Sequence, residues 1–361
     1  MISEMSPRKD VYPPSFYSSP SRGEDERRGW FVYYVFFFSF LFFRFSFAAD
    51  WKPQGPFSHR LQNPLYLQMI QLPAERAVVT PAGELQTEMG ISYSNIYERG
   101  LNATSDIVLD MELLRISPTI RYGVASDFEI GMEIPWIHMG GGFLDPFIQD
   151  FHNIFGFRNG GREKVSNNSF SSHVIHNGTT LYQFNSETFG LGDITFFGKY
   201  HFIKEGEGQP GVALRLGIKA PTGDAGEGTG GGNPGFALGA DLEKSKGRLH
   251  GYFHLDYAID AGNDSLGPIN RTESLNGALA GEVSILKNIS LLAELVGSTP
   301  KFHGTQTHVL DEMPLDFVTG LRGEFGLWTW QASFAEDITS RGPSVDFTTF
   351  LNVGRRISVK Y

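Results

Sequence analysis

The sequence predicts an all-β protein: a transmembrane, antiparallel, up-and-down β-barrel of about 12 strands. Residues 345–361 alternate between apolar and polar side chains and end on the aromatic Tyr361, as the closing strand of a bacterial outer-membrane barrel does. The 361 residues include 43 glycines, 31 phenylalanines and 13 tyrosines, a composition typical of sheets with tight turns and aromatic girdles. After Ala48 no apolar run of about 18 residues remains, so a membrane crossing there requires strands.

Residues 1–48 are predicted to be a leader and a signal peptide that is removed from the mature protein. Arg27 and Arg28 precede an apolar run over residues 30–43, and residues 46–48 place small side chains at alternate positions, so we expect cleavage after Ala48. The alternative is a membrane-anchoring helix, but this run is shorter than the ~20 residues that span a bilayer.

The composition excludes several classes of site and partner. The chain has no cysteine, which rules out disulfides and thiolate metal sites. Its formal net charge of −10 is spread without a basic stripe, which argues against nucleic acid as a partner. We expect neither a metal ion nor a cofactor.

Residues 49–83 precede the first predicted strand and form a periplasmic or plug segment. They carry five prolines and more apolar side chains than a solvated linker needs. We predict that the segment enters the lumen from the periplasmic side as a plug, with its turn at Asn63, Pro64, Leu65 and Tyr66. The alternative is a linker that lies along the rim of the barrel.

The barrel itself is predicted over residues 84–361. Period-two patterning predicts strands at 84–97, 105–123, 126–138, 189–203, 210–221, 234–244, 247–260, 273–286, 288–298, 314–327, 328–339 and 345–361. The connections are short and long in turn, as in outer-membrane barrels, whose short turns are periplasmic and whose long loops are external. We therefore expect a bacterial outer-membrane protein with both termini in the periplasm.

The longest connection, residues 139–188, is predicted to be an external loop that contains a helix. Its apolar residues recur at steps of three and four: Phe143, Leu144, Phe147, Ile148, Phe151, Ile154 and Phe155. Glycines at 140–142 and 160–161 flank this helix as hinges. We expect the loop to cap or constrict the pore, and the alternative is a helix that lies on the outer-leaflet surface.

The polar faces of the central strands are predicted to line the lumen, while their apolar faces contact lipid. The lumen residues that we expect to touch cargo are Lys199, His201, Arg215, Lys219, His250, His254 and Asp256. The alternative is that these charges only satisfy one another, as in any lumen of mixed charge. Arg355 falls on the lipid face of the last strand, where a midplane position costs ~2–4 kcal/mol, so we expect it to snorkel or to contact a neighbouring chain.

Two motif sets carry a resemblance to known families. The stretch 62–68 (Gln-Asn-Pro-Leu-Tyr-Leu-Gln), with Leu72-Pro73 and Arg76-Ala77 after it, resembles the opening of an uncharacterised bacterial outer-membrane β-barrel family, a domain of unknown function, and the likeness extends to the C-terminus. Residues 190–194 (Gly-Leu-Gly-Asp-Ile) and 220–224 (Ala-Pro-Thr-Gly-Asp) are similar to a motif pair of the phenol meta-pathway type of outer-membrane protein. The first resemblance implies a barrel without naming an activity. The second is to proteins associated with uptake of aromatic compounds, but it is short and reflects shared barrel architecture, because loop geometry also favours glycines at turns and Pro-Thr-Gly-Asp at the end of a strand.

Catalytic motifs are not supported. The glycine-rich stretch 226–232 has no helix after it and no Gly-Lys-Ser/Thr, so it is not a phosphate loop. His250 and His254 lie four residues apart on a strand, about 13 Å, and cannot bind one metal ion. Ser172, His173, His176 and Asn177 faintly resemble the His/Ser/Asn set of outer-membrane phospholipases, but the serine at the family spacing is absent.

The sequence therefore predicts a non-enzymatic outer-membrane barrel that is a passive channel or uptake protein for small molecules. The alternative is a non-transporting structural or surface protein, and an outer-membrane lipid hydrolase is a remote third possibility. The partners that we expect are outer-membrane lipid, an unknown small-molecule cargo, and the barrel-assembly machinery, which would read the C-terminal strand that ends in Tyr361.

Overall fold

The computed structural model describes residues 51–156, 162, 165–184, 186–339 and 342–358. The predicted leader and signal peptide and the terminal Tyr361 lie outside these described residues. The chain divides into two units, Met1–Ala48 and Ala49–Tyr361, and everything that follows concerns the second. No helix in the described part of the chain is long and apolar enough to cross a membrane.

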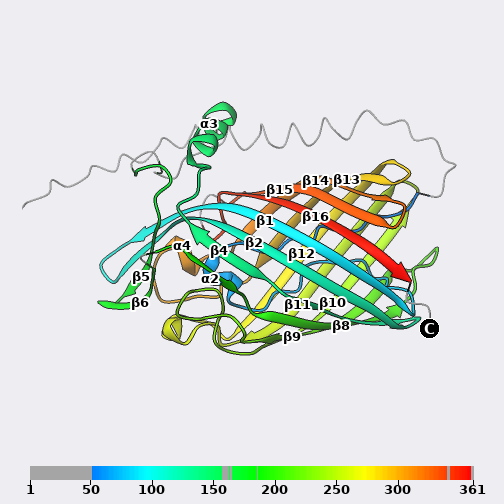
Figure 1. Cartoon of the computed structure of the whole chain (residues 1–361), viewed down its shortest axis with the longest axis horizontal. Helices are drawn as coiled ribbons and strands as arrows, with labels where there is room; N and C mark the ends of the chain where they lie inside the picture. Colours follow the sequence, from blue (N-terminus) through cyan, green and yellow to red (C-terminus); the bar gives the residue numbers. More distant parts are fainter. Residues whose placement is uncertain (1–50, 157–161, 163–164, 185, 340–341, 359–361) are drawn as a thin grey trace, which may run out of the picture. The chain divides into compact units, whose positions relative to one another are not determined.

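The described part of the second unit is a closed antiparallel barrel with twelve strand positions (Figure 1). Ten positions hold one strand each: β1 (Glu84–Leu101), β2 (Ser105–Ala125), β9 (Gly211–Ala220), β10 (Gly235–Lys246), β11 (Leu249–Asp260), β12 (Glu273–Leu286), β13 (Ile289–Ser298), β14 (Leu315–Phe325), β15 (Trp328–Asp337) and β16 (Phe347–Ser358). The sheet closes because β1 pairs with β16 on one side and with β2 on the other. The predicted fold class and strand number are confirmed.

Two of the predicted strands are interrupted. Residues 126–138 form β3 (Phe128–Glu133) and β4 (Trp136–Gly140), and residues 189–203 form β7 (Thr188–Leu191) and β8 (Ile194–Ile203). β3 pairs with β8 and β4 pairs with β7, so the two breaks lie opposite each other. Pro135 cannot donate a ladder hydrogen bond, and Gly192 donates to its carbonyl at 2.7 Å across the break.

The outward face of the barrel is apolar. Along β11, Leu249, Phe253 and Leu255 are exposed, whereas His254 and Asp256 between them are buried on the lumen side. This alternation continues around the sheet and gives the lipid-facing surface of an outer-membrane β-barrel. Arg355 lies exposed on this face of β16, and its guanidinium carbon is 5.2 Å from the centroid of the Trp328 ring on the neighbouring strand, which compensates part of its charge.

The connection 139–188 contains α3 (Asp145–Phe155) and a hairpin, β5 (Ser171–His176) and β6 (Thr179–Phe184). The hairpin was not predicted: β5 extends the sheet beside residues 105–110 of β2, so Ser172, His173 and His176 lie on a strand and not in an open loop. Helix α3 packs on the outer wall. Its Phe147 ring lies 6.1 Å from that of Phe347, and Phe143, just before the helix, stacks on Tyr93 at 5.5 Å.

Buried polar groups fix this loop to the outside of the barrel. Glu112 of β2 accepts hydrogen bonds from the main-chain N–H groups of Phe143 and Leu144, and Arg162 pairs with Asp145 and Asp346. Because these contacts are with outward-facing strand positions, the helix does not constrict the lumen. The structure therefore agrees with the alternative of a helix beside the outer surface of the barrel.

Candidate functional site

A polypeptide segment, residues 52–82, runs through the lumen of the barrel. The centroid of the Trp51 ring lies 4.0 Å from the guanidinium carbon of Arg248, at the turn between β10 and β11. Ala82 forms a β-bridge with Gly123, near the end of β2. Both contacts lie at the end of the barrel where the connections between strands are short. We call it the short-turn end, and the opposite end the long-loop end. Figure 1 shows helix α2 (Pro64–Leu67) within the barrel, toward the end that carries β5 and β6. The segment thus rises from the short-turn end (52–62), turns at α2, and returns (69–82).

The turn of the segment holds the four residues predicted for it. The side chain of Asn63 accepts from the N–H of Leu65 at 3.0 Å and donates to the carbonyl of Pro343 at 3.0 Å, and Pro64 starts the helix. Leu65 and Tyr66 are fully buried. The Asn-Pro pair therefore positions two large side chains in the core at the long-loop end.

That core joins the segment to the external connections. Its members come from the segment, from β1, β2, β4, β5 and β6, and from the loops that carry η2 (Asp264–Leu266) and α4 (His308–Asp311). Among them are Leu61, Leu65, Tyr66, Met69, Ile107, Val174, Tyr182, Leu266, Phe302 and Leu310. We call this set the upper core. Lys301 lies beside it, with its main-chain N–H 3.2 Å from the Tyr66 hydroxyl oxygen, and burial lowers the pKa of Lys301 to about 8.

The rising leg is held by carboxylates that accept its main-chain N–H groups. Glu282 of β12 accepts from Gln54 at 2.8 Å and from Gly55 at 3.0 Å, and Glu294 of β13 accepts from Phe57 at 3.0 Å. Both carboxylates are about 99% buried, each being 1% exposed. Their desolvation is tolerable only because these donors are present.

The returning leg is held in the same way by other strands of the wall, β11, β10 and β3. The N–H of Ile70 donates to Asp260 at 2.7 Å, that of Ala77 to Glu243 at 3.2 Å, and that of Thr80 to Glu129 at 2.6 Å. An extended chain without a sheet partner leaves its N–H groups unsatisfied, and the wall carboxylates supply the missing acceptors.

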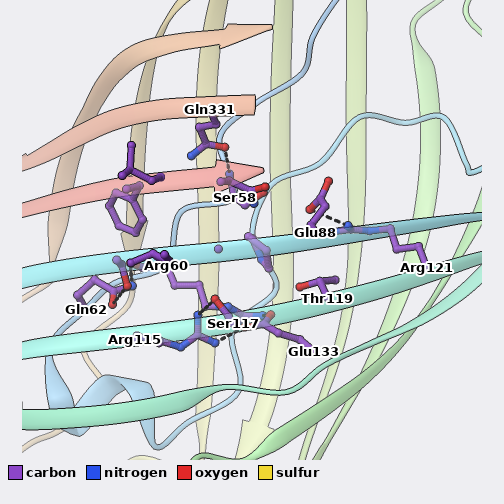
Figure 2. A pocket seen from close by; sticks show the side chains of 17 residues that line it. Ser58, Arg60, Gln62, Glu88, Arg115, Ser117, Thr119, Arg121, Glu133 and Gln331 are labelled. Atoms are coloured by element: carbon purple, nitrogen blue, oxygen red, sulfur yellow. Dashed lines mark hydrogen bonds and ion pairs between the residues drawn. The ribbon is translucent and has the colours of Figure 1, made fainter. Parts of the chain in front are cut away.

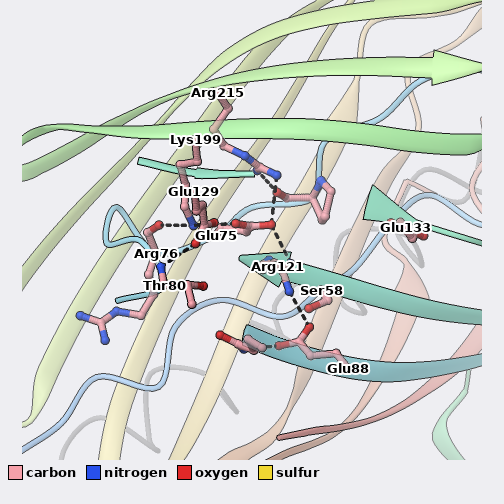
Figure 3. A network of polar contacts seen from close by, with 12 residues as sticks. Ser58, Glu75, Arg76, Thr80, Glu88, Arg121, Glu129, Glu133, Lys199 and Arg215 are labelled. Carbon is pink, nitrogen blue, oxygen red and sulfur yellow. Dashed lines mark hydrogen bonds and ion pairs between the residues drawn. The ribbon is translucent and has the colours of Figure 1, made fainter. Parts of the chain in front are cut away.

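An ion-pair centre forms around Glu75 of the returning leg (Figure 3). Its carboxylate lies 2.9 Å from Arg121 of β2, 3.0 Å from Arg215 of β9 and 2.7 Å from Lys199 of β8. Glu75 is thus the shared partner of three buried cations from three strands. Breaking such a buried arrangement by removing one partner costs about 3–5 kcal/mol.

A small polar cavity remains beside the rising leg (Figure 2). Its volume is about 40 Å³, and Arg60 of the segment and Arg115 of β2 meet in it on the shared carboxylate of Glu133. A single water needs ~10–15 Å³, so this cavity holds a few waters and no organic solute. Among the described residues, the space beside the rising leg is therefore too small for a solute.

Comparison with known proteins identifies the family. The model of a family described as protein of unknown function (DUF3187) matches residues 34–357. The chain belongs to this family. The resemblance of the sequence to an uncharacterised outer-membrane barrel family is thereby confirmed.

Solved structures share the architecture of this DUF3187 protein. The COG4313 outer membrane channel from Pseudomonas putida F1 has 14% sequence identity and a TM-score of 0.52, covering 80% of this chain and 100% of its own. The toluene transporter TodX from Pseudomonas putida has 8% identity and a TM-score of 0.36, covering 84% of this chain and 99% of its own. The first similarity shows a shared fold, and the second is too low to carry an argument. A comparison with curated proteins finds no match.

Six of the seven predicted lumen residues of the DUF3187 protein are buried on the lumen side: Lys199, Arg215, Lys219, His250, His254 and Asp256. Five of them contact the segment or one another, and the His250 Nε2 atom lies 3.1 Å from the Ser284 hydroxyl oxygen. Lys219 donates to the carbonyl of Gln68 and pairs with Asp193, and His254 lies between Asp241 and Asp256. His201 is half-buried near the short-turn end of β8. A role of these residues in cargo binding stays a prediction.

The sequence analysis missed the residues that hold the segment, chiefly Glu75, Glu282 and Glu294. It also assigned no contact to the motif pair at 190–194 and 220–224. Asp193 of that pair accepts from the N–H groups of Gly223 and Gly231, both at 2.9 Å, so the motif folds the loop after β9 onto the barrel wall. Its role in the structure is to shape a loop.

The Ser/His/Asn set forms with a different serine. Ser105 lies 2.9 Å from His176 Nδ1, but its hydroxyl donates to the carbonyl of Thr305 at 2.8 Å, and Asn177 contacts His176 Nε2 at 2.9 Å. Because the serine proton is held by a carbonyl, His176 is not placed to activate this hydroxyl. Among the described residues no group of three or more His, Asp or Glu side chains is suited to a metal ion.

Proposed function

We propose that this protein is a channel that takes up small molecules across the bacterial outer membrane, and that residues 52–82 close it at rest. The observation that carries the proposal is that small residues of the wall leave space in the lumen. Gly211, Ala213 and Gly217 of β9 and Ala237 of β10 leave room for a whole chain, and a Cβ atom at Gly217 would lie 2.7 Å from Leu72 of the segment. A barrel that only needed to fill itself would use large side chains here. The shared fold with an outer membrane channel supports the same proposal.

The short-turn end is proposed to face the periplasm, with both termini there and residues 139–188 outside. The signal peptide 1–48, contact with membrane lipid and reading of the C-terminal strand by the assembly machinery belong to the same proposal. The asymmetry between short turns and long loops supports this orientation.

Cysteine labelling of intact cells tests the orientation. The chain has no cysteine, so single replacements are clean reporters. We expect an impermeant maleimide to label cysteines at the exposed positions Glu227, Ser265 and His308 of the long-loop end, and not at the exposed Glu207 and Lys246 of the short-turn end. The reverse pattern would overturn the orientation.

A non-transporting barrel is the second candidate, and one observation favours it. The upper core seals the long-loop end with buried apolar side chains, and the cavity beside the rising leg holds only about 40 Å³. Conductance of the purified protein separates the two.

Replacing Glu75→Ala in the full-length chain is the most direct test. Three wall cations lose their shared partner, so the closed state loses about 3–5 kcal/mol and the ratio of open to closed channels rises roughly 100-fold or more. Planar-bilayer recordings measure this ratio as open probability. The matched control is Lys244→Ala, which removes a partner of Glu205 at the exposed short-turn end and leaves open probability unchanged. An unchanged open probability in E75A would favour the non-transporting barrel.

A further inference from the structure

We infer that the lumen is a binding site for the main chain of an extended oligopeptide, and that oligopeptides are the cargo class of this channel. The inference rests on the proposed function, because cargo enters the lumen only when the segment leaves it. It starts from the chemistry of the contacts that the wall makes with residues 52–82, since this segment is the one ligand that the structure shows in the lumen.

Side chains of the wall, most of them carboxylates, accept hydrogen bonds from the main-chain N–H groups of the segment. Besides the six donors already described, the N–H of Glu75 donates to Asp241 at 3.2 Å and that of Ser58 to the side-chain oxygen of Gln331 at 3.2 Å. The seven acceptor side chains come from six strands, so the wall contacts both legs along their length: Glu129 of β3, Asp241 and Glu243 of β10, Asp260 of β11, Glu282 of β12, Glu294 of β13 and Gln331 of β15. Such contacts are independent of the side chain that the ligand carries.

Arginine and lysine side chains donate hydrogen bonds to the main-chain carbonyl groups of the segment. Arg322 of β14 donates to the carbonyl of Pro56, Arg215 of β9 to that of Pro73, and Lys199 of β8 to that of Arg76. Lys219 and Lys301 add donors to the carbonyls of Gln68 and Ile70. The wall thus provides partners for both the N–H donors and the carbonyl acceptors of a peptide main chain. A hydrocarbon has neither kind of group.

The segment makes few main-chain hydrogen bonds with itself. Its own side chains serve some of its main-chain groups: Gln71 accepts from the N–H of Leu61 at 3.1 Å, and Arg76 donates to the carbonyl of Pro53 at 3.1 Å. Among the described residues its own main-chain hydrogen bonds are confined to the turn, where Tyr66 and Leu67 donate to the carbonyl of Asn63 and Met69 donates to that of Tyr66. Both legs are extended and depend on the wall. When the segment withdraws, the wall is left with spaced carboxylates and cations that a second extended main chain of similar length satisfies.

A pair of matched peptides tests this inference on the full-length E75A channel. The probe is an acetylated and amidated hexapeptide of alternating alanine and serine, and its partner has the same side chains but a fully N-methylated main chain, which removes the N–H donors. We expect the unmodified peptide to half-block the open current at a concentration roughly tenfold or more below that of the methylated peptide, because hydrogen bonds to charged groups are strong. In proteoliposomes the unmodified peptide should also enter faster.

The variant Glu282→Gln in the same background keeps an acceptor oxygen but removes the carboxylate that accepts from the N–H groups of Gln54 and Gly55, and it should reduce the discrimination between the two peptides at least about threefold. Glu324→Gln, whose carboxylate pairs with Arg356 on the short-turn side, is the control that leaves discrimination unchanged. Equal block by both peptides, or full discrimination in E282Q, would overturn main-chain recognition while the channel stands. Block without uptake would overturn peptides as cargo. Absence of current in both wild type and E75A would overturn the channel and the inference together.

Discussion

Deletion of residues 55–80 is expected to turn a closed barrel into a pore with a large and steady single-channel conductance. The strands stay intact because the segment contributes no strand to the barrel. The lumen changes, because water replaces the main-chain N–H groups of the segment as hydrogen-bond donors to Glu282, Glu294 and Glu129. A barrel of about twelve strands that has lost a two-legged chain contains a water-filled passage. Conductance in planar bilayers and the size limit for neutral sugars in a liposome-swelling assay measure the effect.

The deletion needs a control for folding. Heat-modifiable migration on gels reports the closed sheet, and it should persist in the deleted protein. The separate replacement Pro64→Ala, which keeps the segment in place, should leave conductance low. If the deleted barrel remains heat-modifiable and its conductance and size limit match those of the full chain, the segment does not occlude the pore.

Truncation of residues 353–361 is expected to abolish accumulation in the outer membrane. The lost part of β16 pairs on one side with Glu84–Met89 of β1 and on the other with Trp328–Trp330 of β15. Removing it opens the ring and leaves unpaired backbone N–H and C=O groups facing lipid, each costing several kcal/mol. Such a chain is a substrate for periplasmic proteases. Immunoblots of isolated outer membranes measure the loss.

A point replacement in the same strand separates pairing from side-chain effects. Arg355→Ala removes the contact with Trp328 but leaves every backbone bond, so its yield should stay close to that of the intact protein. Normal outer-membrane yield of the truncated chain would contradict a sheet that closes through β16.

Strand positions were predictable because a barrel wall imposes a period of two, with lipid on one side and polar contacts on the other. The break at Pro135 and the hairpin β5–β6 were not predicted, although both carry local signals. Proline cannot donate to a ladder. Asn177-Gly178 is a strong hairpin dipeptide, and both residues have positive φ, 51° and 75°. The polar neighbours of this turn hid the strands beside it.

The contacts of the segment could not be predicted from the sequence, for a different reason. Asn63-Pro64 marks its turn because proline and asparagine shape the local backbone. The legs have no period, and their partners are main-chain groups, which every residue type presents. The wall carboxylates Glu282 and Glu294 occupy ordinary lumen positions of their strands, and nothing in their spacing distinguishes an acceptor for a peptide N–H from a residue that faces water.

The upper core contains side chains of the segment and of the long loops together, and this couples the two ends of the barrel thermodynamically. When Leu65 and Tyr66 withdraw, Phe302 and Leu310 lose their packing partners, so the loops loosen as the segment leaves. Linkage makes the effect reciprocal. A ligand that holds these loops apart lowers the free energy of withdrawing the segment, and an event at the short-turn end that withdraws the segment raises the affinity of that ligand by the same factor.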